Sequence, residues 1–480
     1  MFGWIRSMFR RPRRYIRRAL RAHDAAETTD NNRRHWANAN SLSADALATP
    51  ARRQLLRNRA RYEVANNAYA RGIVNTYASD VIGTGPRLQM MTDDPDLNSC
   101  IERDFMEWSD AVRLASKLRT GLKATTVDGE MFGLMFTNPK LLHAVQLDLR
   151  LLEADHVTAP NFQRWDDPNY VDGIAFDTYG NPVEYHVLKQ HPGSSTAGLR
   201  LGEYTRYPAR DMLHYFHADR PGQRRGVPDI GASLELFAQL RRYTLAVLSS
   251  AETAANISGV IKTDAPAGTE EEDGSGVEPM DTVDIDRNSL MTLPDGYEMQ
   301  QFKSEQPTTT YKEFKHEILN EAARAIGMPF NIAAGNSSGY NYASGRLDHQ
   351  TYYKSIRVEQ AGLVCDVVDR IFEMWLQEYS LATYTPIENF SHQWFWDGTE
   401  HVDPMKEAKA QDTRLRNNTT TLAYEYARQG RDWEAELHQR AKEKNLMAKL
   451  GLTEADVPEE DDDEDDEEKT ENAFAANQSG

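Results

Sequence analysis

The sequence predicts an α+β protein of several domains, and three observations lead to this class. The chain has 480 residues, which is more than one hydrophobic core usually organises. Segments with helical periodicity occupy residues 42–82, about 95–125 and most of the second half. Between them, residues 130–218 contain short β-branched and aromatic stretches separated by turn residues, which predicts a β-rich domain.

Each predicted helix carries an apolar stripe at helical spacing. The first stripe consists of Val64, Tyr69, Ile73, Tyr77 and Val81. Further stripes run from Ile101 to Val112, from Phe237 to Ala254 and from Tyr352 to Met374. The helical run that carries the stripe from Phe237 to Ala254 has roughly 30 residues. It would be about 45 Å long, which is long for a compact domain.

Glycine and proline mark the ends of several elements. "SDVIGTGPRLQ" (79–89) follows a helix, so Gly83 is predicted to supply the positive φ of a helix end rather than a phosphate-binding loop. "DTYGNP" (177–182) predicts a turn between two strands. A hairpin is predicted around Pro294-Asp295-Gly296, and an irregular loop after Gly327.

Charge is unevenly distributed along the chain. The net charge is −19, yet residues 1–22 contain eight arginines and no acid, and residues 459–468 are ten consecutive acids. The like charges within each block repel one another, so both ends of the chain are expected to be mobile and solvated. Alternatively, the basic end contacts nucleic acid or an acidic partner, and the acidic end contacts a basic partner.

No run of 18 apolar residues is present, and arginines interrupt the N-terminal stretch. We therefore expect neither a membrane span nor a secretory signal, and predict a cytoplasmic site of synthesis and use. Cys100 and Cys365 are far apart and in no CxxC context, so both thiols are predicted to be reduced, buried and inert.

Catalytic and nucleotide-binding motifs are absent from the sequence. GxxxxGK[ST] and GxSxG do not occur, and the glycines at 83 and 85 lack the third glycine and the preceding strand of a dinucleotide fingerprint. Glu153, Asp155 and His156 fall at a predicted strand end and are expected to be solvated. We therefore predict a protein of assembly or interaction, not an enzyme, with no cofactor.

Two further groups contain residue types that can bind metals. His214 and His217 would point to opposite faces of a strand, so they could not share a metal. Asp397, His401 and Asp403 favour a hydrogen-bonded turn over a metal site. No metal site is predicted.

Four strings occur in order between about residues 31 and 447. They are "LRNRARYEVANNAYARGIVNTYASDVIGTGPRLQ" (56–89), "RPGQRRGVP" (220–228), "GMPFNIAAGNSSGYNYASGR" (327–346), and "HVDPMKEAKA" (401–410) with "ARQGRDWEAELHQRAKE" (427–443). Together they resemble the lambda-type family of tailed-bacteriophage portal proteins. The positions taken as family-signature structural residues are Gly83, Gly85, Gln223, Arg225, Gly226, Arg346, Asp403 and Pro404. The family often has Ser-Ser where this chain has Ala343-Ser344.

The resemblance implies a portal-type fold and a ring of about twelve subunits at one capsid vertex. Its implied partners are double-stranded DNA in the channel, the terminase large subunit, the major capsid or scaffold protein and a head–tail adaptor protein, with no membrane. It implies no enzymatic activity, and a location in the virion after assembly in the host cytoplasm. The implied segments are a wing (31–230), stem helices (231–262 and 311–327), a clip (263–310), a channel loop (328–344), a long helix with a return to the wing (345–400) and a helical crown (401–450). The charge pattern adds a basic flexible arm (1–30) and an acidic disordered tail (451–480), and the tail lies outside the resemblance.

The channel loop is where the resemblance implies contact with DNA. The expected DNA-facing residues are Asn331, Asn336, Ser337, Ser338, Tyr340, Asn341, Tyr342 and Ser344. Uncharged polar side chains can touch phosphate without the tight binding that counterion release gives a basic wall. The alternative is a surface loop without DNA contact.

Two other functional classes remain alternatives at this point. One is a packaging-associated nucleic-acid enzyme or ATPase, which the missing phosphate-loop string disfavours. The other is a different structural protein of the capsid or tail.

Overall fold

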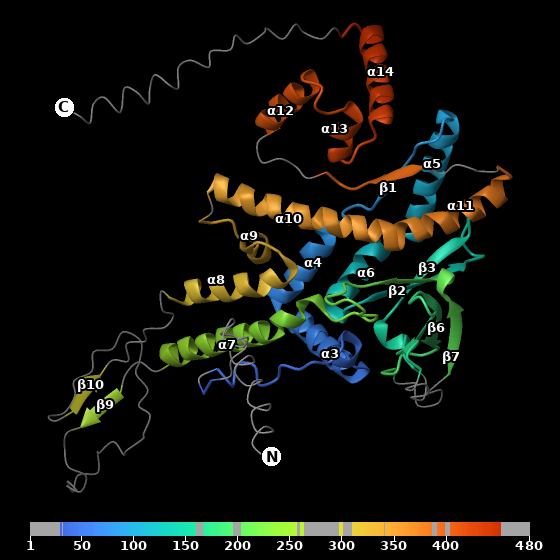
Figure 1. Cartoon of the computed structure of the whole chain (residues 1–480). Helices are drawn as coiled ribbons and strands as arrows, with labels where there is room; N and C mark the ends of the chain where they lie inside the picture. The colour runs from blue at the N-terminus through green and yellow to red at the C-terminus, as the bar shows by residue number, and fades with distance from the viewer. Residues whose placement is uncertain are drawn as a thin grey trace, which may run out of the picture. The chain divides into compact units, whose positions relative to one another are not determined.

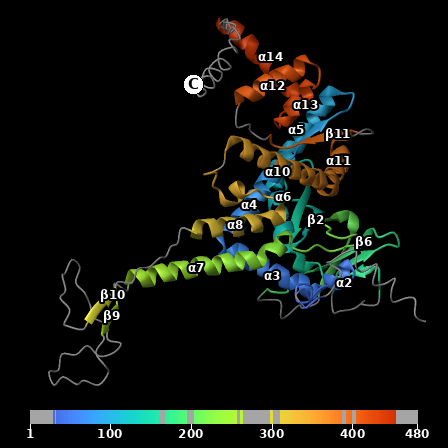
Figure 2. The ribbon, with the colours of Figure 1, turned by 60° about the vertical axis from the view of Figure 1, so that its left-hand side comes forward.

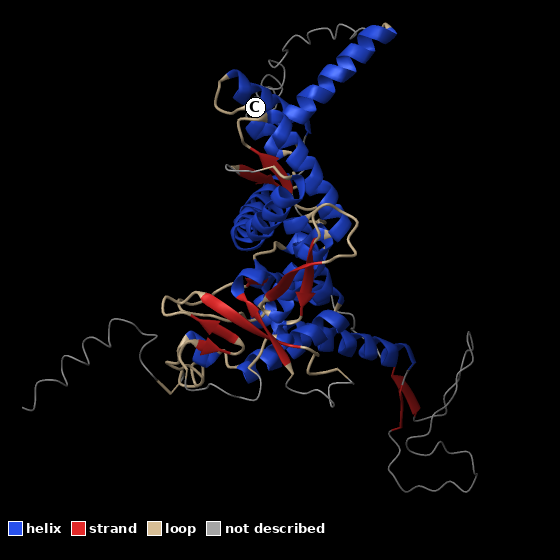
Figure 3. Cartoon of the chain, turned by 90° about the vertical axis from the view of Figure 1, so that its right-hand side faces the viewer, coloured by secondary structure: helices blue, strands red, loops and turns tan. Residues whose placement is uncertain are grey.

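We describe a computed structural model of the chain, which contains both helices and strands (Figures 1 and 3). The described residues are 29–30, 32–159, 167–194, 203–256, 260–263, 297–300, 310–339, 341–385, 391–398 and 404–452. They form two compact units: unit 1 comprises Met1–Val81, Arg119–Lys140 and Gln146–Glu378, and unit 2 comprises Ile82–Leu118, Leu141–Val145 and Tyr379–Gly480. The mixed α and β class is confirmed, whereas most of both charged ends lies outside the described residues.

Unit 1 begins with three helices, α2 (Ala44–Leu47), α3 (Pro50–Asn66) and α4 (Ala68–Ile82). Thr49 caps α3, because its hydroxyl accepts from the Arg52 N–H and Pro50 occupies the first turn. Asn67 separates α3 from α4: its backbone is extended, and its side-chain oxygen accepts from the Tyr69 N–H at 3.1 Å. The predicted helical start is therefore confirmed, but as separate helices.

Two antiparallel sheets confirm the predicted β-rich block in unit 1. One has the order β3 (Leu147–Leu152), β2 (Met131–Thr137), β8 (Met212–Tyr215). The other has the order β4 (Tyr170–Val171), β5 (Ile174–Phe176), β6 (Pro182–Leu188), β7 (Tyr204–Pro208). The predicted "DTYGNP" turn joins β5 to β6, where Asp177 accepts from the N–H groups of Tyr179 and Asn181 at 2.8 Å. Phe132, Ile174, Tyr185 and Met212 pack in the core between these strands.

The helices of the second half of unit 1 are α7 (Leu234–Asn256), α8 (Thr310–Ala323), α9 (Phe330–Ala334), α10 (Tyr342–Leu363) and most of α11 (Asp369–Thr383). A 3-10 helix, η6 (Asp229–Ser233), leads into α7, and a π-helical turn, η8 (Val364–Val368), joins α10 to α11. Strands β9 (Val260–Thr263) and β10 (Tyr297–Gln300) pair with each other beyond α7 and α8, which lie side by side (Figures 1 and 2). Among the described residues, β10 therefore pairs with β9. The turn of the hairpin predicted around Pro294-Asp295-Gly296 lies outside the described residues.

Unit 2 contains a two-stranded antiparallel sheet, β1 (Arg87–Met90) with β11 (His392–Phe395). Its helices are α5 (Pro95–Val112), the start of α6 (Leu114–Asp128), α12 (Pro404–Arg416), α13 (Leu422–Arg428) and α14 (Trp433–Leu450). In α5 the predicted stripe Ile101, Phe105, Trp108 and Val112 is fully buried, as its spacing requires. Within the described part of the chain, no helix is long and apolar enough to cross a membrane.

Two expectations need correction. Cys365, in η8, is exposed and Cys100 is half-buried, so the thiols are not both buried. Helical periodicity around position 365 places the neighbouring Val367 and Val368 inward instead. The stretch 328–344 is not irregular throughout, because α9 forms one helical segment inside it and α10 begins at Tyr342.

Candidate functional site

The string "RPGQRRGVP" forms the centre of a buried ion cluster in unit 1. Arg225 is 1 % exposed, and its guanidinium donates to both oxygens of Glu130 at 2.6 and 2.8 Å. It also lies 3.3 Å from Asp172, which pairs with Arg53 on α3. Burial works to raise the pKa of Glu130, but Arg225 and His214 outweigh it and hold the pKa well below its usual range. The cluster ties α3 to both sheets.

Gln223 and Gly226, in the same string, also have structural roles. Gln223 accepts from the Asp219 N–H at 3.1 Å and donates to the Arg225 carbonyl at 3.0 Å, which fixes the loop before the arginine. A Cβ on Gly226 would lie 1.9 Å from the carbonyl oxygen of Gly129, so only glycine fits this close backbone approach. These signature positions are therefore structural, and sequence reasoning missed their partners Glu130 and Asp172, which are distant along the chain.

A second cluster lies beside a cavity of about 760 Å³ in unit 1. His217 lies just after β8 and contacts Asp229 through Nδ1 at 3.0 Å and Glu359 through Nε2 at 2.9 Å. Its imidazole therefore joins the segment after β8 to η6 and α10. Burial disfavours the charged ring, but the two carboxylates outweigh burial and raise the pKa of His217 to about 10. Tyr215 donates to Glu359 at 2.9 Å. His214 and His217 have different partners: His214 contacts Glu130, whereas His217, which lies beyond the end of β8, contacts Asp229.

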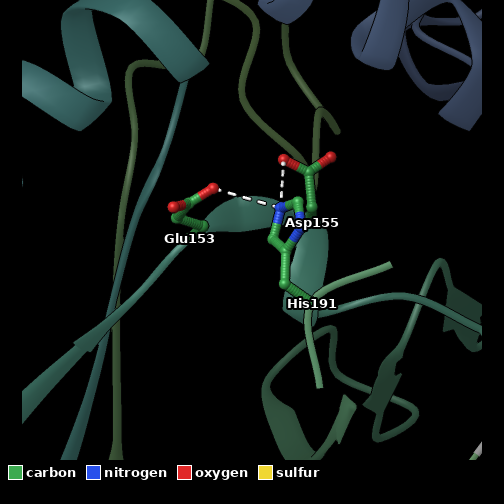
Figure 4. A group of neighbouring side chains, drawn as sticks. All are labelled: Glu153, Asp155 and His191. Carbon is green, nitrogen blue, oxygen red and sulfur yellow. Dashed lines mark ion pairs between the residues drawn. The ribbon is translucent and has the colours of Figure 1, made fainter. Parts of the chain in front are cut away.

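A third cluster contains possible metal ligands, Glu153, Asp155 and His191 (Figure 4). His191 Nε2 lies 3.1 Å from Glu153 and 3.5 Å from Asp155. The guanidinium of Arg61 already pairs with both carboxylates, at 3.4 and 2.9 Å. We therefore interpret the group as an ion-pair cluster. The sequence singled out both carboxylates, but the histidine that joins them is His191 and not the adjacent His156.

The expected DNA-facing residues divide into four groups, of which the buried Asn331 is the last. Asn336, Ser337, Ser338 and Asn341 are exposed, and Asn336 accepts from the Ser338 N–H at 2.9 Å. Tyr342 and Ser344 lie in the first turn of α10, and Tyr340 lies outside the described residues.

Asn331 is a correction to the predicted loop. It lies in α9, is 7 % exposed, and its Nδ2 lies 2.8 Å from His349 Nε2. Because α9 turns this side chain inward onto α10, we remove Asn331 from the candidate DNA-facing set.

The opening glycine turn lies in unit 2. Gly83 has φ +53°, and the side chain of Asp397 accepts from the Thr84 N–H at 2.5 Å and from its hydroxyl at 2.6 Å. The prediction of a helix end is confirmed. Asp397 thus anchors this turn, as the predicted hydrogen-bonded role requires, while His401 and Asp403 lie outside the described residues.

The remaining signature positions carry less information. Arg346 is exposed in α10, and Pro404 is the first residue of α12, where its missing N–H costs no helical hydrogen bond. Gly85 has φ +114°, and its N–H donates to the Ile82 carbonyl at 2.9 Å.

Comparison with known proteins identifies the class. The family model described as phage portal protein, lambda family, matches residues 29–360, which is more than half of the chain. The chain therefore belongs to the lambda family of phage portal proteins, a family of structural proteins. A similar relative is a probable portal protein of Halomonas phage phiHAP-1, which is 24 % identical over 433 residues, covering 83 % of this chain and 82 % of the relative.

Solved structures with a similar arrangement come from gene transfer agent particles. The neck of the native particle, computed with C12 symmetry, has a TM-score of 0.46 at 13 % identity and covers 77 % of this chain and 92 % of that one. A chain of the native virion has a TM-score of 0.45 at 15 % identity and covers 78 % and 92 %. Both TM-scores are below 0.5.

Proposed function

We propose that this chain is one subunit of a closed ring at a capsid vertex, through which double-stranded DNA passes during packaging and ejection. The family membership of residues 29–360 is the observation that carries this proposal. A ring closes when one face of a subunit meets a different face of its neighbour and the rotations add to a full turn. The proposed number of subunits is about twelve.

The helices α7 and α8 are the proposed stem. No residue of α7 between 241 and 253 is buried within the chain, although Leu245 and Leu248 are large apolar residues that are 58 % and 55 % exposed. On α8, Phe314 is 48 % exposed. Two helices alone cannot bury both of their apolar faces, so a neighbouring copy is the proposed cover for these side chains.

The segment between the stem helices, 263–310, is the proposed clip that meets the terminase large subunit. The exposed polar residues Asn336, Ser337, Ser338 and Asn341 are proposed to face DNA in the channel. Uncharged groups would allow sliding, because they release few counterions from the duplex. The major capsid or scaffold protein and a head–tail adaptor are the other proposed partners, in the host cytoplasm during assembly and then in the virion.

Electron microscopy of the purified protein tests the ring. The proposal expects end-on class averages with a central hole and one rotational symmetry. Particles without a hole at every concentration would contradict it. The non-enzymatic role is tested separately, since measurable ATP hydrolysis by the pure protein would favour a packaging enzyme instead.

A further inference from the structure

Within the part of the chain that the structure describes, helix α14 in unit 2 packs against α13 only near its beginning. All residues from 437 to 450 are exposed, and α14 extends beyond α12 and α13 (Figures 1 and 2). Asp432 caps its beginning by accepting from the Glu434 N–H at 2.9 Å, and Gly451 ends it at φ +71°. Helices in proteins gain most of their stability from tertiary packing, so a covering partner would stabilise α14.

One face of α14 combines basic and apolar side chains. Lys442, Leu446, Lys449 and Leu450 follow the spacing i, i+4, i+7 and i+8, which places them on one side of the helix. Leu446 is 56 % exposed and Leu450 is 65 % exposed. We call these four residues the α14 face. Its chemistry fits an acidic segment that also carries some apolar residues.

The chain itself supplies such a segment immediately after α14. Residues 453–480 contain 13 acidic residues and one lysine, together with Val457 and Phe474. The segment starts two residues after the glycine that ends the helix. Its 28 residues span up to about 90 Å when extended, whereas α14 is about 27 Å long. The segment is therefore long enough to turn back and run along the whole helix.

We propose that the acidic segment 453–480 docks on the α14 face, pairing its carboxylates with Lys442 and Lys449 and covering Leu446 and Leu450. The contact neutralises a basic surface that would otherwise attract other polyanions, DNA included. The lysines also offset the partial negative charge at the C-terminal end of the helix, where an acidic segment would otherwise be repelled. This proposal does not depend on ring formation.

The test uses the full chain in two forms: the parent, and a neutral-tail variant in which the ten acids at 459–468 become Asn and Gln. The probe is a fluorescently labelled peptide with the sequence of residues 453–480, and its anisotropy reports binding. The docked segment of the parent competes at a high effective concentration, so the neutral-tail variant should bind the peptide about tenfold more tightly or better. Binding should weaken as salt rises.

Two charge-reversal variants locate the site. In the neutral-tail chain, Lys442→Glu with Lys449→Glu should abolish peptide binding. Lys140→Glu with Lys354→Glu, which reverses two exposed lysines outside α14, should leave binding unchanged. Circular dichroism checks that both variants are folded. Equal peptide affinity of the parent and neutral-tail chains overturns the proposal. An equal loss of peptide binding in the two charge-reversal variants also overturns it, because the peptide would then be attracted by the net charge of the whole protein.

Discussion

Arg225 and Glu130 form a two-pronged ion pair at 2.6 and 2.8 Å although 95 residues separate them, and neither side chain is more than 1 % exposed. Two charges removed from water this completely are stable only as a pair with all hydrogen bonds made. His214 and the Gly226 N–H supply further donors to Glu130, at 3.2 and 3.3 Å. The pair therefore fixes the strand β2 against the loop that leads into α7.

Removing one partner of this pair should destabilise unit 1 strongly. Arg225→Met leaves the Glu130 carboxylate buried without its main partner, which should cost about 3–5 kcal/mol. Urea unfolding followed by fluorescence measures the loss. Arg416→Met is the control, because Arg416 pairs with Asp412 at an exposed site and should cost less than about 1 kcal/mol. Similar losses of unfolding free energy in both variants would show that the buried cluster does not stabilise unit 1 more than an exposed ion pair does.

A methyl group at Gly226 should also destabilise the fold. The added Cβ would meet the Gly129 carbonyl, a backbone group that cannot swing aside, so Gly226→Ala should cost about 3 kcal/mol. Gly231→Ala is the matched control in the same segment, since a Cβ there meets nothing within 4 Å. Thermal unfolding compares them, and a Gly226→Ala midpoint equal to that of Gly231→Ala would refute the close approach.

The His217 cluster should make stability fall at alkaline pH. The pKa of His217 is raised to about 10 in the folded chain, against about 6.5 when unfolded. Its contribution is therefore complete below about pH 6.5 and is lost as the pH rises toward 10. The difference in thermal midpoint between the parent and His217→Gln should shrink over that range. A difference that is constant or grows with pH would show that the two carboxylates do not hold the ring charged.

The exposed loop residues should affect DNA rather than assembly. Asn336→Lys with Asn341→Lys adds two charges that release counterions from duplex DNA, so DNA should move more slowly and packaging should fall. The mass of the purified ring should not change. The amount of DNA packaged per capsid and the mass of the purified ring are the two measurements. Unchanged packaging with intact rings would place these residues away from DNA, and loss of rings would make the loop an assembly element.

Local patterns predicted the local structure well. The stripe in α5, the strands of 130–218 and the helix end at Gly83 follow from periodicity and turn chemistry, which depend on neighbouring residues. The break between α3 and α4 at Asn67 could not be predicted from the sequence. An asparagine inside a helical pattern can either continue the helix or cap the next one, and only the structure shows that its side chain caps α4.

Contacts between distant segments were not predictable in the same way. Arg225 stood out within its string, but nothing local identifies Glu130 or Asp172 as its partners. The burial of Asn331 likewise depends on His349 in another helix, and the pairing of β10 with β9 spans a long connection. The function was predicted from the resemblance to a family, because the sequence contains no catalytic or ligand-binding pattern that would indicate it.

The mass of the purified protein in solution tests ring formation most directly. Light scattering should give about 650 kDa, close to twelve copies of a 54.5 kDa chain. Leu245→Asp with Leu248→Asp, which places charge on the exposed face of α7, should reduce this to subunits of 54.5 kDa with unchanged helical content. Tyr179→Asp, at an exposed turn outside the stem, is the control and should keep the ring. A parent chain that stays monomeric at every concentration, or a ring that tolerates both aspartates on α7, would contradict the proposed stem interface.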